Sequence, residues 1–94
     1  LFEAAKWYHK GAEAGHAMAQ FSYGRAVEKG AGVEMNLKKA ANWYRLSAEK
    51  GIGSAQLNLA GLYFHGHGVD NNLSEVYRWY SIAKFYLKTE GTAA

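Results

Sequence analysis

Two histidines, His65 and His67, stand on either side of a single glycine. A His-x-His pair of this kind can contribute two ligands to a metal site. Asp70 follows in the same segment, but His9 and His16 lie elsewhere, and no other acidic residue or histidine stands at a recognisable ligand spacing. The chain contains no cysteine, which excludes thiolate ligands and disulfides. We therefore interpret His65 and His67 as polar residues of a loop region and expect no metal site.

The residues that usually carry catalysis form no recognisable pattern. There are two Gly-x-Gly segments, Gly30 to Gly32 and Gly66 to Gly68, and neither is followed by the pattern that a dinucleotide site needs. A glycine-rich phosphate loop with its lysine is absent. The serines mostly occupy positions that an internal repeat explains, and the acidic residues are scattered over the predicted helix surfaces. We expect no enzymatic activity and no cofactor.

Length, charge and hydropathy limit the remaining function classes. At 94 residues the chain is long enough for one small domain. Its net charge of +3 is mild and its basic residues are spread along the sequence, whereas nucleic-acid binding usually shows a concentrated basic stripe. We therefore expect no nucleic-acid partner. No apolar run approaches the roughly 20 residues that a membrane span needs. The first residue is Leu1, which indicates a longer or processed parent chain, and a cytoplasmic, periplasmic or secreted location is equally compatible.

An internal repeat organises the sequence. A tryptophan–tyrosine dipeptide recurs every 36 residues, at Trp7-Tyr8, Trp43-Tyr44 and Trp79-Tyr80. When residues 5–44 are aligned with residues 41–80, 15 of the 40 positions are identical. Chance would give about two or three identities, and a fixed period of this length is typical of repeat architectures.

Each period contains two helical patterns. In residues 37–50 the apolar side chains recur at the i, i+3, i+4 and i+7 spacing of one helix face, with Asn36 placed as the N-cap and Gly51 as the stop. The second pattern, residues 54–66, has Ser54 as its predicted N-cap and ends in a glycine-rich loop whose valine should contact the core. With their copies, these patterns predict five helices, at residues 1–14, 18–29, 37–50, 54–66 and 73–88.

Neither helix of a pair can bury its apolar stripe alone, so we expect neighbouring pairs to stack. The alanines at four repeat positions should let the helix backbones approach closely, and the tryptophans and tyrosines should fill the space between the layers. The alanines in question are Ala12, Ala19, Ala48 and Ala55. The predicted fold class is therefore all-α, built from stacked helix pairs.

The repeated motifs resemble a known family. They include AQLNLAGLY at residues 55–63, GHGV at residues 66–69 and AANWYR at residues 40–45. These motifs and their period resemble the Sel-one-like repeat (SLR), a relative of the tetratricopeptide repeat, over about residues 1–83. The resemblance implies a right-handed α-solenoid that works as a non-catalytic adaptor. Members of the family act in bacterial host interaction and signalling, and in eukaryotic protein quality control at the endoplasmic reticulum.

The chain departs from the family pattern at a few positions. The family often has a proline after the loop valine, where this chain has Glu34 and Asp70. Lys84 and Leu87 replace the small residues of the other copies, so we expect the last helix to run on and cap the array. We divide the chain into the second helix of a preceding repeat, a complete repeat, a repeat with a capping-like end, and a tail. These units are residues 1–16, 17–52, 53–88 and 89–94.

The resemblance places the first helix of each repeat along a concave face, which predicts a binding site for a peptide or protein segment. Its expected contacts are residues that lie off the buried stripes: Ser22, Arg25, Lys29, Asn58, Phe64 and His65. The Asn58 amide can pair with a peptide backbone because it both donates and accepts hydrogen bonds. Arg25 and Lys29 can hold a carboxylate, and Phe64 is a candidate apolar anchor.

A structural role is the alternative. The open face of the first helix, with Phe2, and the aromatic last helix, with Phe85 and Tyr86, could pair chains end to end or exchange helices. In that case the solenoid ends would form a homo-oligomer.

Overall fold

The computed structural model describes residues 2–91, and the side chains of residues 3–85. This part of the chain forms five helices and no strand. They are α1 (Phe2–Glu13), α2 (Ala17–Lys29), α3 (Leu37–Glu49), α4 (Gly53–His65) and α5 (Leu73–Gly91). The predicted all-α fold class and the five helices are confirmed. The last helix runs on beyond the predicted residue 88, as the replacements at positions 84 and 87 indicated.

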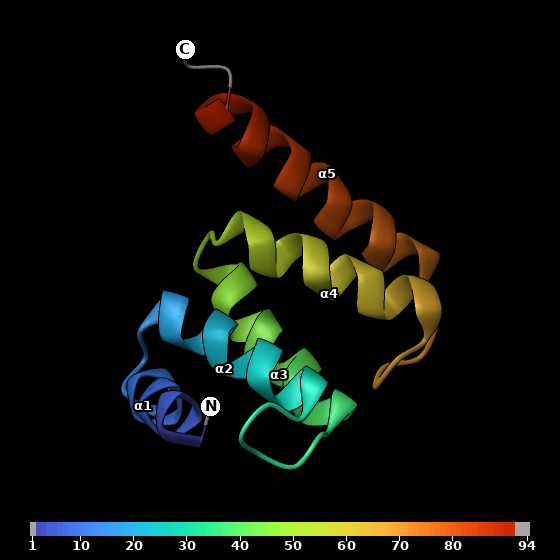
Figure 1. The fold of residues 1–94 in the computed structure, drawn as a ribbon. Coiled ribbons are helices and arrows are strands. Elements are labelled where there is room, and N and C mark those ends of the chain that lie inside the picture. The colour runs from blue at the N-terminus through green and yellow to red at the C-terminus, as the bar shows by residue number, and fades with distance from the viewer. Residues whose placement is uncertain (1, 92–94) are drawn as a thin grey trace.

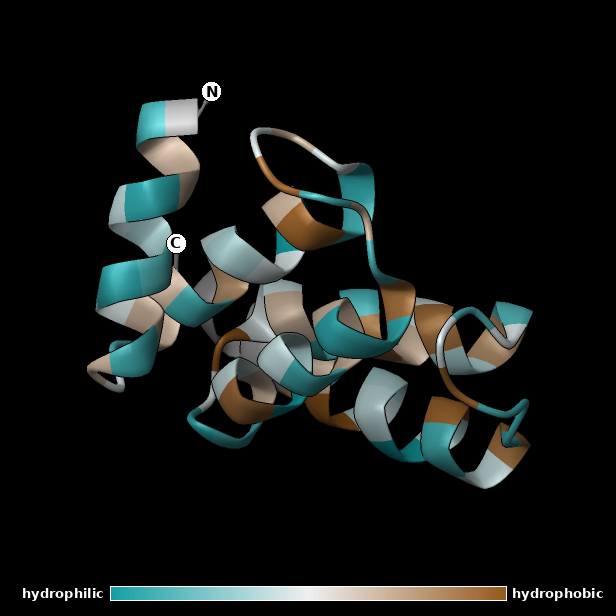
Figure 2. Ribbon diagram, turned by 90° about the horizontal axis from the view of Figure 1, so that it is seen from below, coloured by the Kyte–Doolittle hydropathy of each residue, from teal (hydrophilic) through white to brown (hydrophobic). Residues whose placement is uncertain are grey.

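The helices stack in chain order from α1 to α5 (Figure 1). Each of α2, α3 and α4 packs against the helix before it and the helix after it. Hydrophobic and hydrophilic stretches alternate along the helices in Figure 2, as expected for helices that bury one face against their neighbours. The result is the row of helix pairs that the period of 36 residues predicted.

Small residues let the stacked helices approach closely. Ala12, Ala48 and Ala55 are almost completely buried, as predicted. A Cβ atom on Gly11 of α1 would lie 2.7 Å from the Cβ atom of Ala19 on α2. Because such a distance is shorter than a carbon–carbon contact allows, the closest approach of α1 and α2 requires glycine at this point.

The helix ends agree with the predicted signals, with one exception. The Asn36 side chain accepts a hydrogen bond from the Lys39 N–H at 2.9 Å, so the N-cap of α3 is confirmed. Ser54 was predicted to cap α4, and this is wrong. The helix begins at Gly53 after Ile52, whose carbonyl accepts the Gln56 N–H at 3.0 Å, and no side chain caps it. Ser54 is therefore an exposed residue of the first turn.

The prediction that the tryptophans fill the space between the layers is wrong for Trp7. Trp79 is buried, Trp43 is partly exposed, and Trp7 is 65% exposed. The reason is positional, because each indole reaches back towards the preceding helices. The Trp43 ring meets the rings of His9 on α1 and Tyr23 on α2, whereas the described chain offers Trp7 no helix before α1.

Candidate functional site

A hollow of about 530 Å³ lies between α2 and α4. This volume falls within the range of about 300–1,000 Å³ typical of ligand sites. The α2 wall consists of Phe21, Arg25, Glu28 and Lys29. The α4 wall consists of Ser54, Leu57, Asn58, Gly61, Leu62 and His65, with His67 from the following loop. We call this feature the α2–α4 groove.

Four of the six predicted contact residues line the α2–α4 groove: Arg25, Lys29, Asn58 and His65. They come together because α2 and α4 are the equivalent helices of successive repeats, and Lys29 and His65 take equivalent places on them. Ser22 and Phe64 do not line it. Phe64 is 58% exposed, and its ring contacts His65 with 5.0 Å between centroids.

Ser22 lies in a second, smaller hollow of about 240 Å³ between α1 and α2. The floor of this hollow is formed by Ala4, Ala5 and Tyr8. One period later, the equivalent residues Ala40, Ala41 and Tyr44 are wholly buried. The surface of the second hollow is therefore of a kind that a neighbouring helix covers elsewhere in the chain.

The side chain of Tyr44 joins the two walls of the α2–α4 groove. Its ring is completely buried on α3, and its hydroxyl donates a hydrogen bond to the Glu28 carboxylate at 2.5 Å. Burial is the main cause that raises the pKa of the Tyr44 phenol well above its usual value, and Glu28 raises it further, while the side chain of Asn58 acts in the opposite direction. Tyr44 therefore stays a neutral donor that is hydrogen-bonded to Glu28 of α2 and is influenced by Asn58 of α4.

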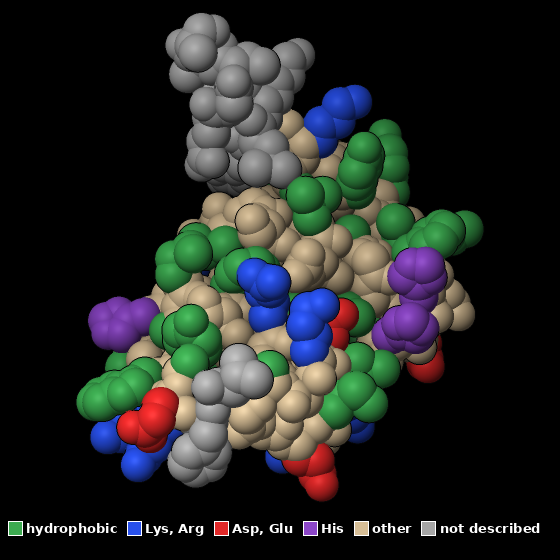
Figure 3. Space-filling view, in the orientation of Figure 1, with side chains coloured by type: hydrophobic (Ala, Val, Ile, Leu, Met, Phe, Trp, Pro, Cys, Tyr) green, Lys and Arg blue, Asp and Glu red, His purple; other side chains and the backbone are tan. Residues whose placement is uncertain are grey.

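The groove carries unpaired positive charge. Arg25 and Lys29 are both exposed, and the ion pairs among the described side chains, His9–Glu13 and Arg78–Glu75, involve neither of them. The Arg25 guanidinium lies over the Phe21 ring, 5.8 Å from its centroid. Figure 3 shows two basic side chains next to each other near the middle of this face, and two histidines together at its edge.

The depth of the α2–α4 groove was not predicted from the sequence. A Cβ atom added to Gly61 would have no heavy atom within 4 Å, so the missing side chain leaves open space in the α4 wall. The period did contain a signal for this. Gly61 is the counterpart of Arg25 one repeat earlier, so one wall projects a long side chain where the other projects none.

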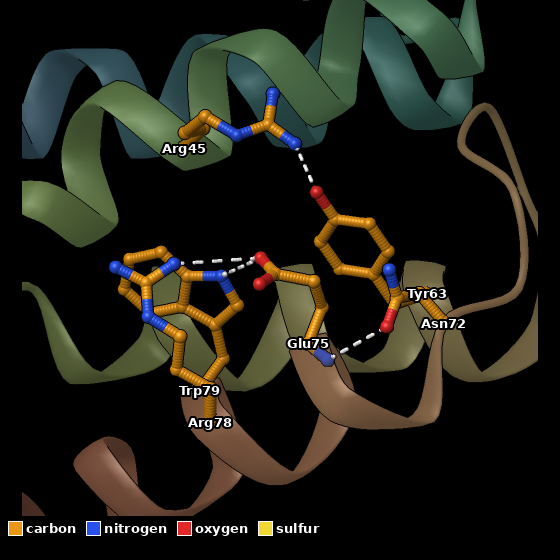
Figure 4. A network of polar contacts seen from close by, with 6 residues as sticks. All are labelled: Arg45, Tyr63, Asn72, Glu75, Arg78 and Trp79. Carbon is orange, nitrogen blue, oxygen red and sulfur yellow. Dashed lines mark hydrogen bonds and ion pairs between the residues drawn. The ribbon is translucent and has the colours of Figure 1, made fainter.

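Two groups of polar contacts among side chains of α3, α4 and α5 lie outside the groove, one around Tyr63 and one around Glu75 (Figure 4). The Arg45 guanidinium on α3 donates to the Tyr63 hydroxyl on α4. On α5, the Glu75 carboxylate accepts from the Trp79 indole at 3.2 Å and from Arg78 at 3.5 Å. The side chain of Asn72 accepts the Glu75 N–H at 3.1 Å and so begins α5. The Arg45–Tyr63 contact joins α3 to α4, and the contacts of Glu75 stabilise the first turns of α5.

The described residues show neither a metal site nor a membrane span. The His65 and His67 rings stack with 5.2 Å between centroids, but the described residues contain no group of three or more potential ligands from His, Cys, Asp and Glu. Among the helices that the structure describes, none combines the length and the apolar character needed to cross a membrane.

Comparison with known proteins gives consistent results. The family model described as Sel1 repeat matches residues 2–16, 17–52 and 53–84. The structure is similar to that of a Sel1 repeat protein from Oxalobacter formigenes, with a TM-score of 0.87 and 38% identity over 90% of this chain and 35% of that chain. No curated protein sequence matches the chain.

A second similar structure is that of c5321, a protective antigen present in uropathogenic Escherichia coli strains displaying an SLR fold. The TM-score is 0.86 and the identity 35%, over 88% of this chain and 18% of that chain. The present chain thus spans 35% of the length of the first similar protein and 18% of the second.

Proposed function

Because this chain belongs to the Sel1 repeat family, we propose that it is a non-catalytic scaffold that binds a peptide or protein segment in the α2–α4 groove. Proteins of this family generally mediate protein interactions. The observation that carries the proposal is the groove itself, which is open, has the volume of a ligand site and is lined by two cations, Arg25 and Lys29, that form no ion pair among the described residues. Arg25, Lys29, Asn58 and His65 are its proposed contacts.

Each wall contributes to binding in a different way. The Asn58 amide can pair with the backbone of an extended segment, because it offers both a donor and an acceptor. Phe21 and Leu57 give the groove an apolar part on which a side chain can pack. Ser22 and the exposed Phe64 lie outside the groove, so we propose them as contacts only for a partner larger than a peptide.

The substitution Gly61→Leu tests this function while sparing the fold. The new side chain would project into open space in the groove, and leucine favours a helix over glycine by roughly 0.8 kcal/mol. Displayed peptides of random sequence would be selected on the chain, and the affinities of the enriched peptides would be measured by calorimetry. We expect Gly61→Leu to weaken them by at least about tenfold, since it fills the space they occupy.

Ser81→Leu is the matched control, because Ser81 is exposed on α5 and lines no part of the groove. It adds the same apolar side chain elsewhere and should leave binding unchanged. Failure to enrich any peptide, or equal affinity for the chain and for Gly61→Leu, would refute the groove as the binding site.

Assembly through the ends of the stack is a second candidate function. The observation that favours it is a row of exposed apolar side chains on α5, in which Leu73 and Tyr77 are each 74% exposed and Tyr80 is 53% exposed. The predicted contacts Phe2 and Tyr86 lie outside the residues whose side chains are described. A sedimentation coefficient that rises with protein concentration would support this candidate, and a constant monomer would exclude it for this chain.

A further inference from the structure

We propose that the segment bound in the α2–α4 groove contains an acidic residue two positions from an apolar one. The acidic side chain lies between Arg25 and Lys29, and the apolar side chain packs on Phe21 and Leu57. This inference rests on the proposed function and adds the chemistry of the partner, which is a protein segment with negative charge.

The α2–α4 groove carries more positive than negative charge. Two cations, Arg25 and Lys29, line it together with a single carboxylate, that of Glu28. Glu28 already accepts the Tyr44 hydroxyl at 2.5 Å, and Tyr44 is held neutral because burial raises its pKa. Neither cation forms an ion pair within the described part of the chain. A carboxylate from a partner is the group that complements such a surface.

The lining also changes character along the groove. Phe21 on α2 and its repeat equivalent Leu57 on α4 form an apolar part. Arg25 and Lys29 follow Phe21 one and two turns further along α2. The α2 wall is therefore apolar towards the start of the helix and basic towards its end, which calls for a ligand with two different side chains in a fixed order.

The distance between Phe21 and Arg25 gives the spacing of those two side chains. Arg25 follows Phe21 by four positions in α2, and a helix rises about 6 Å over four residues. In an extended peptide, side chains two positions apart point to the same side, about 6.6 Å from one another. An apolar residue and an acidic residue at positions i and i+2 therefore match the distance from Phe21 to Arg25, the nearer of the two cations, whose guanidinium lies 5.8 Å from the centroid of the Phe21 ring.

The selection of random peptides also tests this inference. The enriched sequences should contain Asp or Glu two positions from an apolar residue more often than the starting library does. The double variant Arg25→Gln/Lys29→Gln should bind them about tenfold more weakly, because exposed ion pairs each change affinity by up to about fivefold. Raising the salt concentration should weaken binding by the original chain much more than binding by this variant.

Two further variants separate local from general effects of charge. Lys6→Gln/Lys84→Gln removes the same net charge from exposed positions outside the groove and should bind like the original chain. Arg25→Glu/Lys29→Glu should lose the acidic peptides and gain those in which lysine replaces the acidic residue. That exchange of preference requires direct contact between the groove and the charged residue of the peptide.

The possible results separate this inference from the proposed function. Enriched peptides that lack the acidic residue, yet lose binding to Gly61→Leu, would overturn the acidic partner and retain the groove as the site. Equal weakening by the Lys6/Lys84 and Arg25/Lys29 double variants would overturn it as well. If no peptide is enriched, or if Gly61→Leu changes nothing, both proposals fail together.

Discussion

Residues at equivalent positions of two successive layers in this stack differ in how deeply they are buried. Tyr44 in the middle of the chain is completely buried, whereas Tyr80, one period later, is 53% exposed. The tryptophans beside them show the reverse, since Trp79 is buried and Trp43 is partly exposed. The comparison teaches that an identical residue at a repeat position does not fix its own burial, because the neighbouring helices decide it.

One cause of the difference is visible on the facing helix. A Cβ atom on Gly24 of α2 would lie 2.9 Å from two carbon atoms of the Tyr44 ring, so the ring occupies the space that the glycine leaves. In the next repeat this position is Ala60. Asn58 of α4 also acts on the Tyr44 hydroxyl. It is therefore enclosed between two helices, and Tyr80 is not.

The largest effect should come from removing these two rings in turn. Tyr44→Ala should lower the free energy of unfolding by about 3–5 kcal/mol, as found for large buried aromatic side chains. Tyr80→Ala should change it by less than about 0.5 kcal/mol, because the ring is half exposed. Urea denaturation of both variants measures the two values. Similar losses would show that the two layers pack alike and that the comparison is mistaken.

Most of the fold was predictable because it depends on periodic signals. The offset of 36 residues located five helices, and the predicted N-cap Asn36 was correct because its hydrogen bond is local. The errors were made where tertiary neighbours decide. Ser54 had the right residue type for a cap, but α4 starts at Gly53, and the exposed Trp7 has the same repeat position as the buried Trp79.

The site was predictable in part for the same reason. The period placed Arg25, Lys29, Asn58 and His65 on equivalent faces, and the structure brings them to one groove. The depth at Gly61 and the bond from Tyr44 to Glu28 depend on distances between helices, which a sequence pattern does not contain. The binding role of all these residues stays a prediction until peptides are tested.

Two glutamines extend the comparison between the layers. Gln20 and Gln56 are buried at equivalent positions, and each donates through Nε2 to a carbonyl of the preceding helix, that of Ala12 or Ala48. The Oε1 atom of Gln20 accepts from the Lys50 ammonium at 3.1 Å. The Oε1 atom of Gln56 is buried and has no hydrogen-bond partner. Both Nε2 and Oε1 of Gln20 therefore have hydrogen-bond partners, whereas only Nε2 of Gln56 has one.

Leucine at each position should separate the two glutamines. Gln20→Leu should cost about 1–2 kcal/mol, because the hydrogen bonds of Gln20 to the Ala12 carbonyl and to the Lys50 ammonium are both lost. Gln56→Leu should cost less than about 0.5 kcal/mol, since the loss at Ala48 is offset by removing an unpaired buried acceptor. Denaturation midpoints at equal m-values give both numbers. A Gln56→Leu variant that is destabilised as much as Gln20→Leu would mean that Oε1 of Gln56 is satisfied in solution.

The smallest effect is a pH dependence that only the enclosed tyrosine should produce. The pKa of the Tyr44 phenol is raised above its ordinary value of 10.0, chiefly by burial and then by Glu28. Above about pH 10 the unfolded chain therefore releases a proton that the folded chain retains, so the free energy of unfolding falls as the pH rises, by about 1 kcal/mol over the first unit. Tyr44→Phe should remove this part of the slope.

Tyr80→Phe is the matched control for that measurement, since it deletes the equivalent hydroxyl from the exposed ring. Its unfolding free energy between pH 9 and pH 11 should follow the original chain, while that of Tyr44→Phe should fall less steeply. At neutral pH Tyr44→Phe should also release Glu28, which can then turn towards Arg25 and weaken the binding of acidic peptides. If both variants have the same alkaline slope, the Tyr44 hydroxyl is reached by solvent, and the enclosure that distinguishes the first layer from the second is incomplete.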